Sequence, residues 1–194
     1  ARLSEIRKIG FSPVYVFLDG VSSDASENVK AGNQKIRDEI SKLRREGVIE
    51  EIFLSHHNLG VGAGILCAVD WFFSQENFGI ILEDDCQIGA SAHIFAKNVL
   101  LELTGDDLFG GFCLTKYSLD PNIYGIRSAH GTSFFQSWGW GTSAEVWKKF
   151  RSANLSQVTR TSLFKRLSFL PLIERGILTQ ILFFKYGKAT NENS

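Results

Sequence analysis

Three adjacent acidic residues, Glu83, Asp84 and Asp85, follow a short apolar run at residues 80–82. The run has no polar alternation, which is typical of a strand buried on both faces of a mostly parallel sheet. Ligands of open α/β sheets bind at the carboxyl ends of such strands. If the chain stays extended, Glu83 and Asp85 point one way and Asp84 the other. Because adjacent carboxylates repel, a divalent cation shared with phosphate is one interpretation, and a solvated acidic loop is the other.

A second apolar run, residues 13–18, also ends in an acid, Asp19, which is followed by Gly20. Asp-Gly is a common turn sequence, so Asp19 has a structural interpretation as the first residue of a turn. In a parallel sheet Asp19 would lie at the same edge as the acidic triplet. A carboxylate at that edge can accept a hydrogen bond from a nucleobase imide, which is the functional interpretation.

A glycine-rich segment, residues 56–64, joins an expected strand to an expected helix. Glycines at such a turn let the backbone approach a ligand, and helix amino ends attract phosphate. The spacing matches neither the dinucleotide GxGxxG pattern nor a P-loop, so a structural tight turn is the alternative. His56 and His57 would face opposite ways in extended chain, which favours solvated or capping histidines over a metal pair.

Further candidates lie in the carboxyl-terminal half of the chain. Trp138 and Trp140 flank Gly139, and such tryptophans either pack in a core or shape a surface for a planar or sugar ligand. His130 stands between Ala129 and Gly131. We interpret it as a further metal ligand or phosphate contact, with an ordinary loop histidine as the alternative.

The elements that would position these residues alternate along the chain. This alternation predicts right-handed βαβ crossovers and an α/β fold with a mostly parallel sheet flanked by helices. A helix is expected to open at residues 143–145 and to include Trp147. The other expected helices are residues 3–9, 29–47, 65–73 and 90–103, the expected strands are residues 13–18, 48–54, 78–82 and 110–115, and residues 116–132 are expected to form a long loop.

Composition sets the class of protein. With 194 residues, we expect one globular domain over residues 1–194 that closes with a polar tail at residues 189–194. A formal net charge of +0 gives no bulk attraction to nucleic acid, so no nucleic-acid partner is expected. No apolar run of about 20 residues is present, and the 3 cysteines are widely spaced, which together predict a cytoplasmic protein with reduced thiols and no zinc site. The basic, apolar residues 160–184 fit either peripheral membrane association or a buried helical pair.

At residues 14–20, 58–62, 79–86 and 137–142, the sequence resembles nucleotide-sugar glycosyltransferases of the GT-A type. It is similar to bacterial family 2-like enzymes and more distantly to N-acetylglucosaminyltransferase I, which also carries Glu-Asp-Asp. The resemblance spans residues 14–150. It implies a GT-A-like, Rossmann-like domain that transfers a sugar from a nucleotide-diphosphate sugar, with UDP as the expected nucleotide. The acceptor would be a carbohydrate, lipid-linked or protein hydroxyl.

The resemblance also implies roles for single residues. Asp85 would bind Mn²⁺ or Mg²⁺ on the donor diphosphate. Glu83 and Asp84 would contact the ribose or donor sugar, and Asp19 the base. The segment with Trp138, Gly139 and Trp140 would line the donor sugar and the acceptor pocket.

Two parts of the family pattern are missing from this sequence. The family's first strand would precede residues 2–10, and the carboxylate that acts as base would follow the Trp-Gly segment in a Trp-Asp or Glu-Asp element. Residues 148–194 carry no such element, and Glu174 has no supporting pattern. With 0 methionines in the chain, we expect a fragment that lacks the first strand and the carboxyl-terminal part of the family's fold. A sugar nucleotidyltransferase and a non-catalytic carbohydrate- or protein-binding domain are the alternatives.

Overall fold

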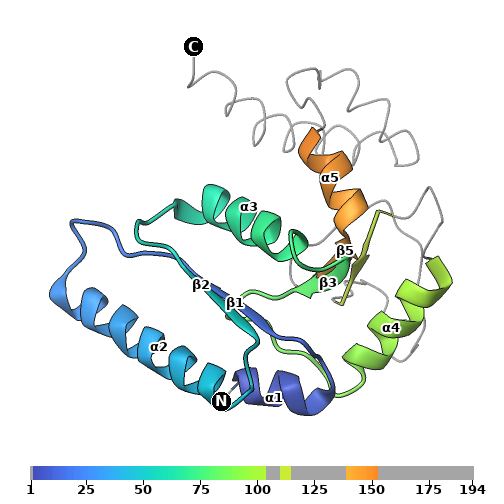
Figure 1. Cartoon of the computed structure of the whole chain (residues 1–194), viewed down its shortest axis with the longest axis horizontal. Helices are drawn as coiled ribbons and strands as arrows, with labels where there is room; N and C mark the ends of the chain where they lie inside the picture. The colour runs from blue at the N-terminus through green and yellow to red at the C-terminus, as the bar shows by residue number, and fades with distance from the viewer. Residues whose placement is uncertain (1, 104–109, 115–138, 153–194) are drawn as a thin grey trace, which may run out of the picture. The chain divides into compact units, whose positions relative to one another are not determined.

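The computed structural model describes residues 2–103, 110–114 and 139–152 (Figure 1). By its internal contacts the chain divides into two units, Ala1–Lys148 and Lys149–Ser194. The elements in chain order are α1 (Arg2–Ile9), β1 (Tyr15–Leu18), α2 (Glu27–Arg45), β2 (Glu51–Leu54), α3 (Gly60–Phe73), β3 (Phe78–Ile81), α4 (Ala92–Leu103), β4 (Phe112–Cys113), β5 (Trp140–Ser143) and α5 (Ala144–Ser152).

The first sheet consists of β1 and β2, which pair in parallel from Tyr15↔Glu51 to Leu18↔Leu54. Successive side chains of a strand point to opposite faces, and here helices cover both faces. On one face, α2 packs its buried Ile40 and Leu43 against apolar side chains of both strands. On the other face, the ring of Trp71 from α3 lies 5.6 Å from that of Phe53. The expected parallel βαβ unit is therefore confirmed for these two strands.

The second sheet has the order β3-β5-β4, and β5 is antiparallel to both neighbours. Since both neighbours run against β5, β3 and β4 share one direction, as a β3-α4-β4 crossover requires. The predicted single, mostly parallel sheet is nevertheless wrong for the described residues, because an antiparallel strand separates β3 from β4. Gly141 allows this insertion, because the ring of Phe112 fills the position that a Cβ would take there.

Helix α3 contributes to the cores on both sheets. Its Trp71 faces the first sheet, while its Val69 packs with the indole rings of Trp140 in β5 and Trp147 in α5. The opposite face of the second sheet is covered by α4, whose Ala96 and Val99 cluster with Phe112. Figure 1 shows α3 on one side of the strands and α2 on the other. The result is a mixed α/β arrangement of three layers.

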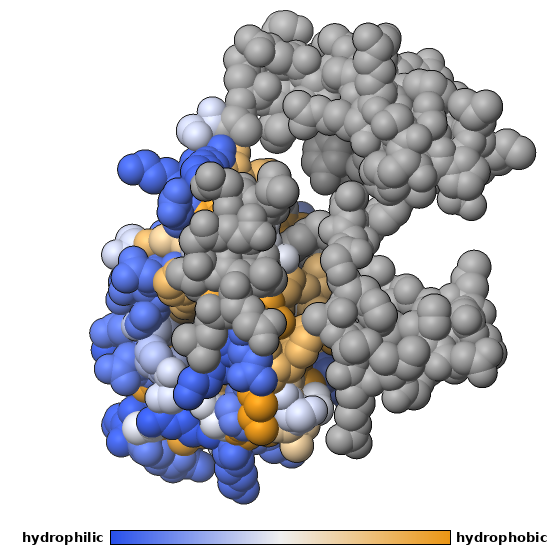
Figure 2. Space-filling model, turned by 90° about the vertical axis from the view of Figure 1, so that its right-hand side faces the viewer, coloured by the Kyte–Doolittle hydropathy of each residue, from blue (hydrophilic) through white to orange (hydrophobic). Residues whose placement is uncertain are grey.

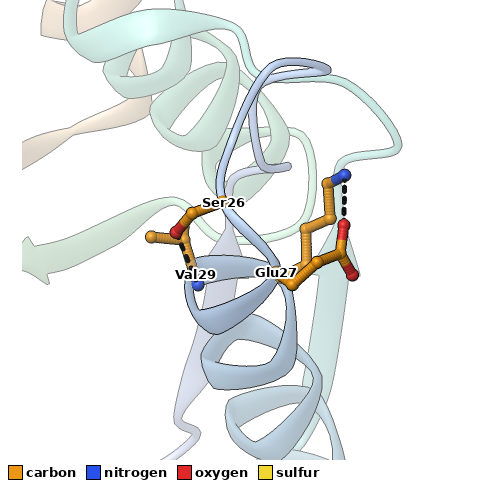
Figure 3. Close-up of polar contacts among 4 residues, drawn as sticks. Ser26, Glu27 and Val29 are labelled. Atoms are coloured by element: carbon orange, nitrogen blue, oxygen red, sulfur yellow. Dashed lines mark hydrogen bonds and ion pairs between the residues drawn. The ribbon is translucent and has the colours of Figure 1, made fainter.

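Two helices begin earlier than the sequence indicated. Helix α2 begins at Glu27, because the Oγ of Ser26 accepts a hydrogen bond from the amide of Val29 at 3.4 Å (Figure 3). In the same turn, Lys30 Nζ lies 2.9 Å from Glu27 Oε1. Helix α3 begins at Gly60 and not near residue 65, so the glycine-rich segment supplies its first turn.

On the side of the molecule shown in Figure 2, hydrophilic residues cover most of the described surface and hydrophobic ones gather in a strip. Exposed large hydrophobic side chains include Val61 of α3 and Ile94 of α4. Among the helices of the described ranges, none is both long enough and apolar enough to cross a bilayer.

Candidate functional site

The acidic triplet lies on an exposed turn directly after β3. Glu83, Asp84 and Asp85 are all exposed, and the amide of Cys86 donates to the carbonyl of Glu83 at 3.1 Å. This bond closes a turn with Asp84 and Asp85 at its two central positions. The expectation of strictly alternating side chains is therefore wrong, because the extended strand ends at Ile81 and the acids occupy a bend. The three residues are exposed at the carboxyl end of the strand.

The Trp-Gly segment meets this strand end through sheet pairing. In the register of β3 and β5, Ile81 lies opposite Trp140. Gly139 precedes Trp140, and a Cβ at Gly139 would lie 3.4 Å from Cδ2 of Leu82, the residue before Glu83. Gly139 also has φ 67°, in the left-handed region that favours glycine. Two motifs far apart in the sequence are thus adjacent at the end of β3.

The structure describes two of the three predicted residues of the Trp-Gly segment, Gly139 and Trp140. Trp140 is 8% exposed, and its ring lies 6.1 Å from that of Trp147, so the structure supports core packing for this side chain. Because the Trp140 ring is buried in this core, it is not placed to contact a ligand directly. Gly139 lies at the strand end, as described above. Trp138 and His130 lie outside the described residues, and their predicted contacts remain predictions.

Asp19, at the end of β1, is bonded to backbone amides of its own fold. Its Oδ1 accepts from the amide of Gly20 at 2.8 Å, and the amide of Leu59 donates to Oδ1 at 3.0 Å and to Oδ2 at 3.1 Å. Leu59 is the residue before α3, so Asp19 caps that helix from a different strand. An ionised carboxylate has about four lone-pair sites, so little capacity is left for a base. Base binding by Asp19 stays a prediction.

The glycine-rich segment is held tightly at its beginning and is open at its centre. A Cβ at Gly20 would lie 2.5 Å from the backbone carbon of His57, so the two loops touch through their main chains. By contrast, Gly60 and Gly62 are exposed, and no atom of the described residues lies within 4 Å of the position that a Cβ would take at either glycine. The carboxylate of Asp19 already occupies the amino end of α3, and its charge disfavours a phosphate there. The geometry favours the structural interpretation of this turn.

Two residues of α2, Asn33 and Arg37, join this region and were not among the predicted site residues. Arg37 Nε donates to Asn33 Oδ1 at 2.7 Å, and Arg37 Nη2 donates to the carbonyl of Ser55 at 2.8 Å. Asn33 Nδ2 donates to the carbonyl of Asp19 at 3.4 Å. The spacing of four residues, which places Asn33 and Arg37 on one side of a helix, is the sequence signal that could have identified them.

The cation predicted at the acidic turn stays a prediction. In the part of the chain that the structure describes, no group of three His, Cys, Asp or Glu side chains could enclose a metal ion. Mg²⁺ is usually bound through one or two carboxylates together with substrate phosphates, and not in an all-protein cage. Asp85, which is exposed on this turn, carries the kind of oxygen ligand that such a shared site uses.

Comparisons of this chain with protein-family models, with curated proteins and with solved structures found no match.

Proposed function

We propose that this chain is the donor-binding domain of a metal-dependent glycosyltransferase of the GT-A type. The donor would be a nucleotide-diphosphate sugar, with UDP as the nucleotide and Mn²⁺ or Mg²⁺ as the cation. The single observation that carries the proposal is that Gly139 packs against Leu82. It brings the Trp-Gly segment to the strand end from which Glu83, Asp84 and Asp85 project.

The exposed carboxylates would bind the donor from one side. Asp85 would hold the cation that neutralises charge developing on the departing diphosphate. Glu83 and Asp84 would orient the ribose or donor sugar by accepting hydrogen bonds from hydroxyl groups. Gly139 is buried, and a Cβ there would meet Leu82 and Leu114, so this glycine would hold the Trp-Gly segment beside the acidic turn and would not itself contact the sugar. No residue is assigned as the catalytic base.

Calorimetric titration of the chain with UDP tests the proposal. We expect UDP to bind in the presence of Mn²⁺ and to lose most of its affinity when the metal is chelated. Asp85→Ala should weaken binding by about tenfold or more, which corresponds to about 1.4 kcal/mol. Glu39→Ala removes an exposed acid of α2 and serves as the control that leaves binding unchanged. Metal-independent binding that Asp85→Ala does not affect would contradict the proposed role.

Enzyme assays separate the proposal from its two rivals. A transferase should release UDP from a UDP-sugar when an acceptor is supplied, and a slower release to water is expected without one. A sugar nucleotidyltransferase would instead consume UTP and a sugar phosphate and release pyrophosphate. A carbohydrate-binding module would bind a glycan without metal and would turn over neither a UDP-sugar nor UTP.

A further inference from the structure

Leu82, Gly139 and Leu114 lie side by side at one end of the second sheet, one residue beyond the last paired row of β3, β5 and β4. Gly139 is the middle one of the three, because β5 lies between the other two strands. The amide of Leu114 donates to the carbonyl of Gly139 at 2.7 Å, which joins β4 to β5 beyond the paired row. Since Glu83 follows Leu82 directly, this end row connects the acidic turn to the residue after β4.

The missing side chain of Gly139 lets the two leucines converge. A Cβ at Gly139 would lie 3.4 Å from Cδ2 of Leu82, and 3.5 and 3.6 Å from Cβ and Cδ1 of Leu114. Both leucine side chains therefore lie against the same glycine on one face of the sheet. Gly139 is buried, and its φ of 67° is strained for most other residues. Leu82 is thus held, through Gly139, by the residue that follows β4.

Leu114 is in turn anchored in the core under α4. Its half-buried side chain packs against the cluster of Ala96, Val99 and Phe112, of which the first two belong to α4. A closely packed core resists changes in volume and passes the displacement of one side chain on to its neighbours. Leu114 therefore links this core to the strand end that leads into the acidic turn.

We infer that Leu114 is a positioning residue of the donor site, which holds the acidic turn through Gly139 and Leu82 without touching the donor. This inference rests on the proposed function. Truncation of the Leu114 side chain leaves a gap beside Gly139, into which Leu82 can move. Glu83 and the turn that it begins would move with Leu82. Groups that bind a ligand must be held within about 0.5 Å of the productive geometry, so such a shift should weaken donor binding.

Leu100 of α4 provides a matched control. Its side chain is also half-buried and packs against the same cluster as that of Leu114. Leu100→Ala therefore removes the same atoms from the same core, but from α4 and not from the strand end. The two alanine variants should lower the midpoint of urea denaturation by similar amounts. A loss of UDP affinity that only Leu114→Ala shows would therefore report on the acidic turn and not on general stability.

The experiment compares wild type, Leu114→Ala, Leu114→Met and Leu100→Ala by hydrogen exchange without ligand and by UDP titration with Mn²⁺. Two amides serve as probes, since that of residue 114 bonds to Gly139 and that of Cys86 closes the acidic turn by bonding to Glu83. In Leu114→Ala we expect exchange of both amides to rise about fivefold and UDP affinity to fall about tenfold. Leu114→Met nearly keeps the side-chain volume, so it should recover most of both losses. Leu100→Ala should keep UDP affinity within about twofold of wild type.

Different results overturn the inference and the proposed function. If Leu114→Ala binds UDP as wild type does, or if Leu100→Ala loses as much affinity, Leu114 is not a positioning residue of the donor site. If Leu114→Ala does not fold, the smaller truncation Leu114→Val decides, and wild-type exchange and binding in that variant overturn the inference. If wild type itself fails to bind UDP with Mn²⁺, the proposed function is wrong, and exchange of the Cys86 amide alone decides whether Leu114 holds the acidic turn.

Discussion

Strands β1 and β3 both lead into acidic residues, but the two strand ends differ in what the acids contact. At the end of β1, Asp19 accepts hydrogen bonds from two backbone amides, and the loop behind it packs against His57. At the end of β3, Glu83, Asp84 and Asp85 are exposed on a turn. The hydrogen bonds show that Asp19 stabilises the fold, whereas the exposed triplet is the part to which the proposed function assigns the ligand.

The same contrast applies to the glycines beside the two acidic sites. Gly20 lies so close to the backbone of His57 that a Cβ there would approach within 2.5 Å, while Gly89, beyond the triplet, has nothing within 4 Å. Among the described residues, Gly20 is thus closely packed against a second loop, whereas Gly89 has open space where a side chain would stand. The comparison predicts that substitutions at the first end change stability and that substitutions at the second change binding.

The largest expected effect on stability comes from Asp19→Ala. This change removes the acceptor for the amides of Gly20 and Leu59 and the cap of α3, which should lower the free energy of unfolding by about 2 to 3 kcal/mol. Urea denaturation followed by circular dichroism measures the loss. If Asp19→Ala is as stable as wild type but binds UDP poorly, Asp19 is a ligand-binding residue and the comparison is wrong.

Gly20→Ala should have the next largest effect. Its Cβ would collide with main-chain atoms of His57, which cannot rotate away as a side chain can, so we expect a loss of about 1 to 3 kcal/mol. Gly89→Ala is the matched control at the other strand end and should stay within about 0.5 kcal/mol of wild type. Equal losses in the two variants, measured by the same denaturation, would remove the contrast in packing.

Tyr15→Phe tests a contact that joins β1 to the turn before β3. The Tyr15 hydroxyl donates to Glu76 Oε1 at 2.7 Å, and this hydrogen bond is the main cause that raises the pKa of Tyr15 from 10.0 to about 12. Since the pKa is higher in the folded state, the contact stabilises the protein below pH 10 and is lost as the pH rises toward 12. We expect Tyr15→Phe to lose about 1 kcal/mol at neutral pH.

The pH dependence provides the check on Tyr15. Ultraviolet absorbance of tyrosinate should show a tyrosine in wild type that ionises only as the pH approaches about 12. This component should be missing in Tyr15→Phe. The stability difference between wild type and variant should shrink as the pH rises from 10.0 to about 12. A difference that stays constant over this interval would mean that the hydroxyl does not provide the stabilisation.

The smallest effect on stability is expected for Asp85→Asn. Asp85 is exposed on the turn after β3, and a neutral side chain there relieves repulsion between neighbours, so stability should change by less than about 0.5 kcal/mol. UDP binding with Mn²⁺ should nevertheless fall sharply, because an amide is a weaker metal ligand than a carboxylate. Parallel denaturation and titration curves separate these two results. A large stability loss without a change in binding would reverse the assignment of the two strand ends.

Local sequence signals predicted the elements whose formation depends on near neighbours. The apolar runs before Asp19 and Glu83 form β1 and β3. Ser143 caps α5, because its Oγ accepts a hydrogen bond from the amide of Val146 at 3.1 Å. The long loop expected at residues 116–132 lies outside the described ranges. The alternation of strands and helices was sufficient to indicate a mixed α/β fold.

Long-range contacts decided what the sequence did not predict. Strand β5 contains glycine and no alternating apolar pattern, and it forms because β3 and β4 both supply hydrogen-bonding edges to it. The amide of Leu59 donates hydrogen bonds to Asp19, 40 positions earlier in the chain, and no local sequence pattern reveals such a contact. Arg37 was missed for the same reason, since its partner Ser55 lies on another element.

Helix α3 couples the unfolding of the two sheets. Its Trp71 packs on Phe53 of the first sheet, and its Val69 packs with Trp140 of the second. Opening either sheet would therefore expose one side of the same helix and weaken the packing of the other. We expect the sheets to unfold as one cooperative unit, with a single transition in calorimetry, although they share no strand pairing among the described residues.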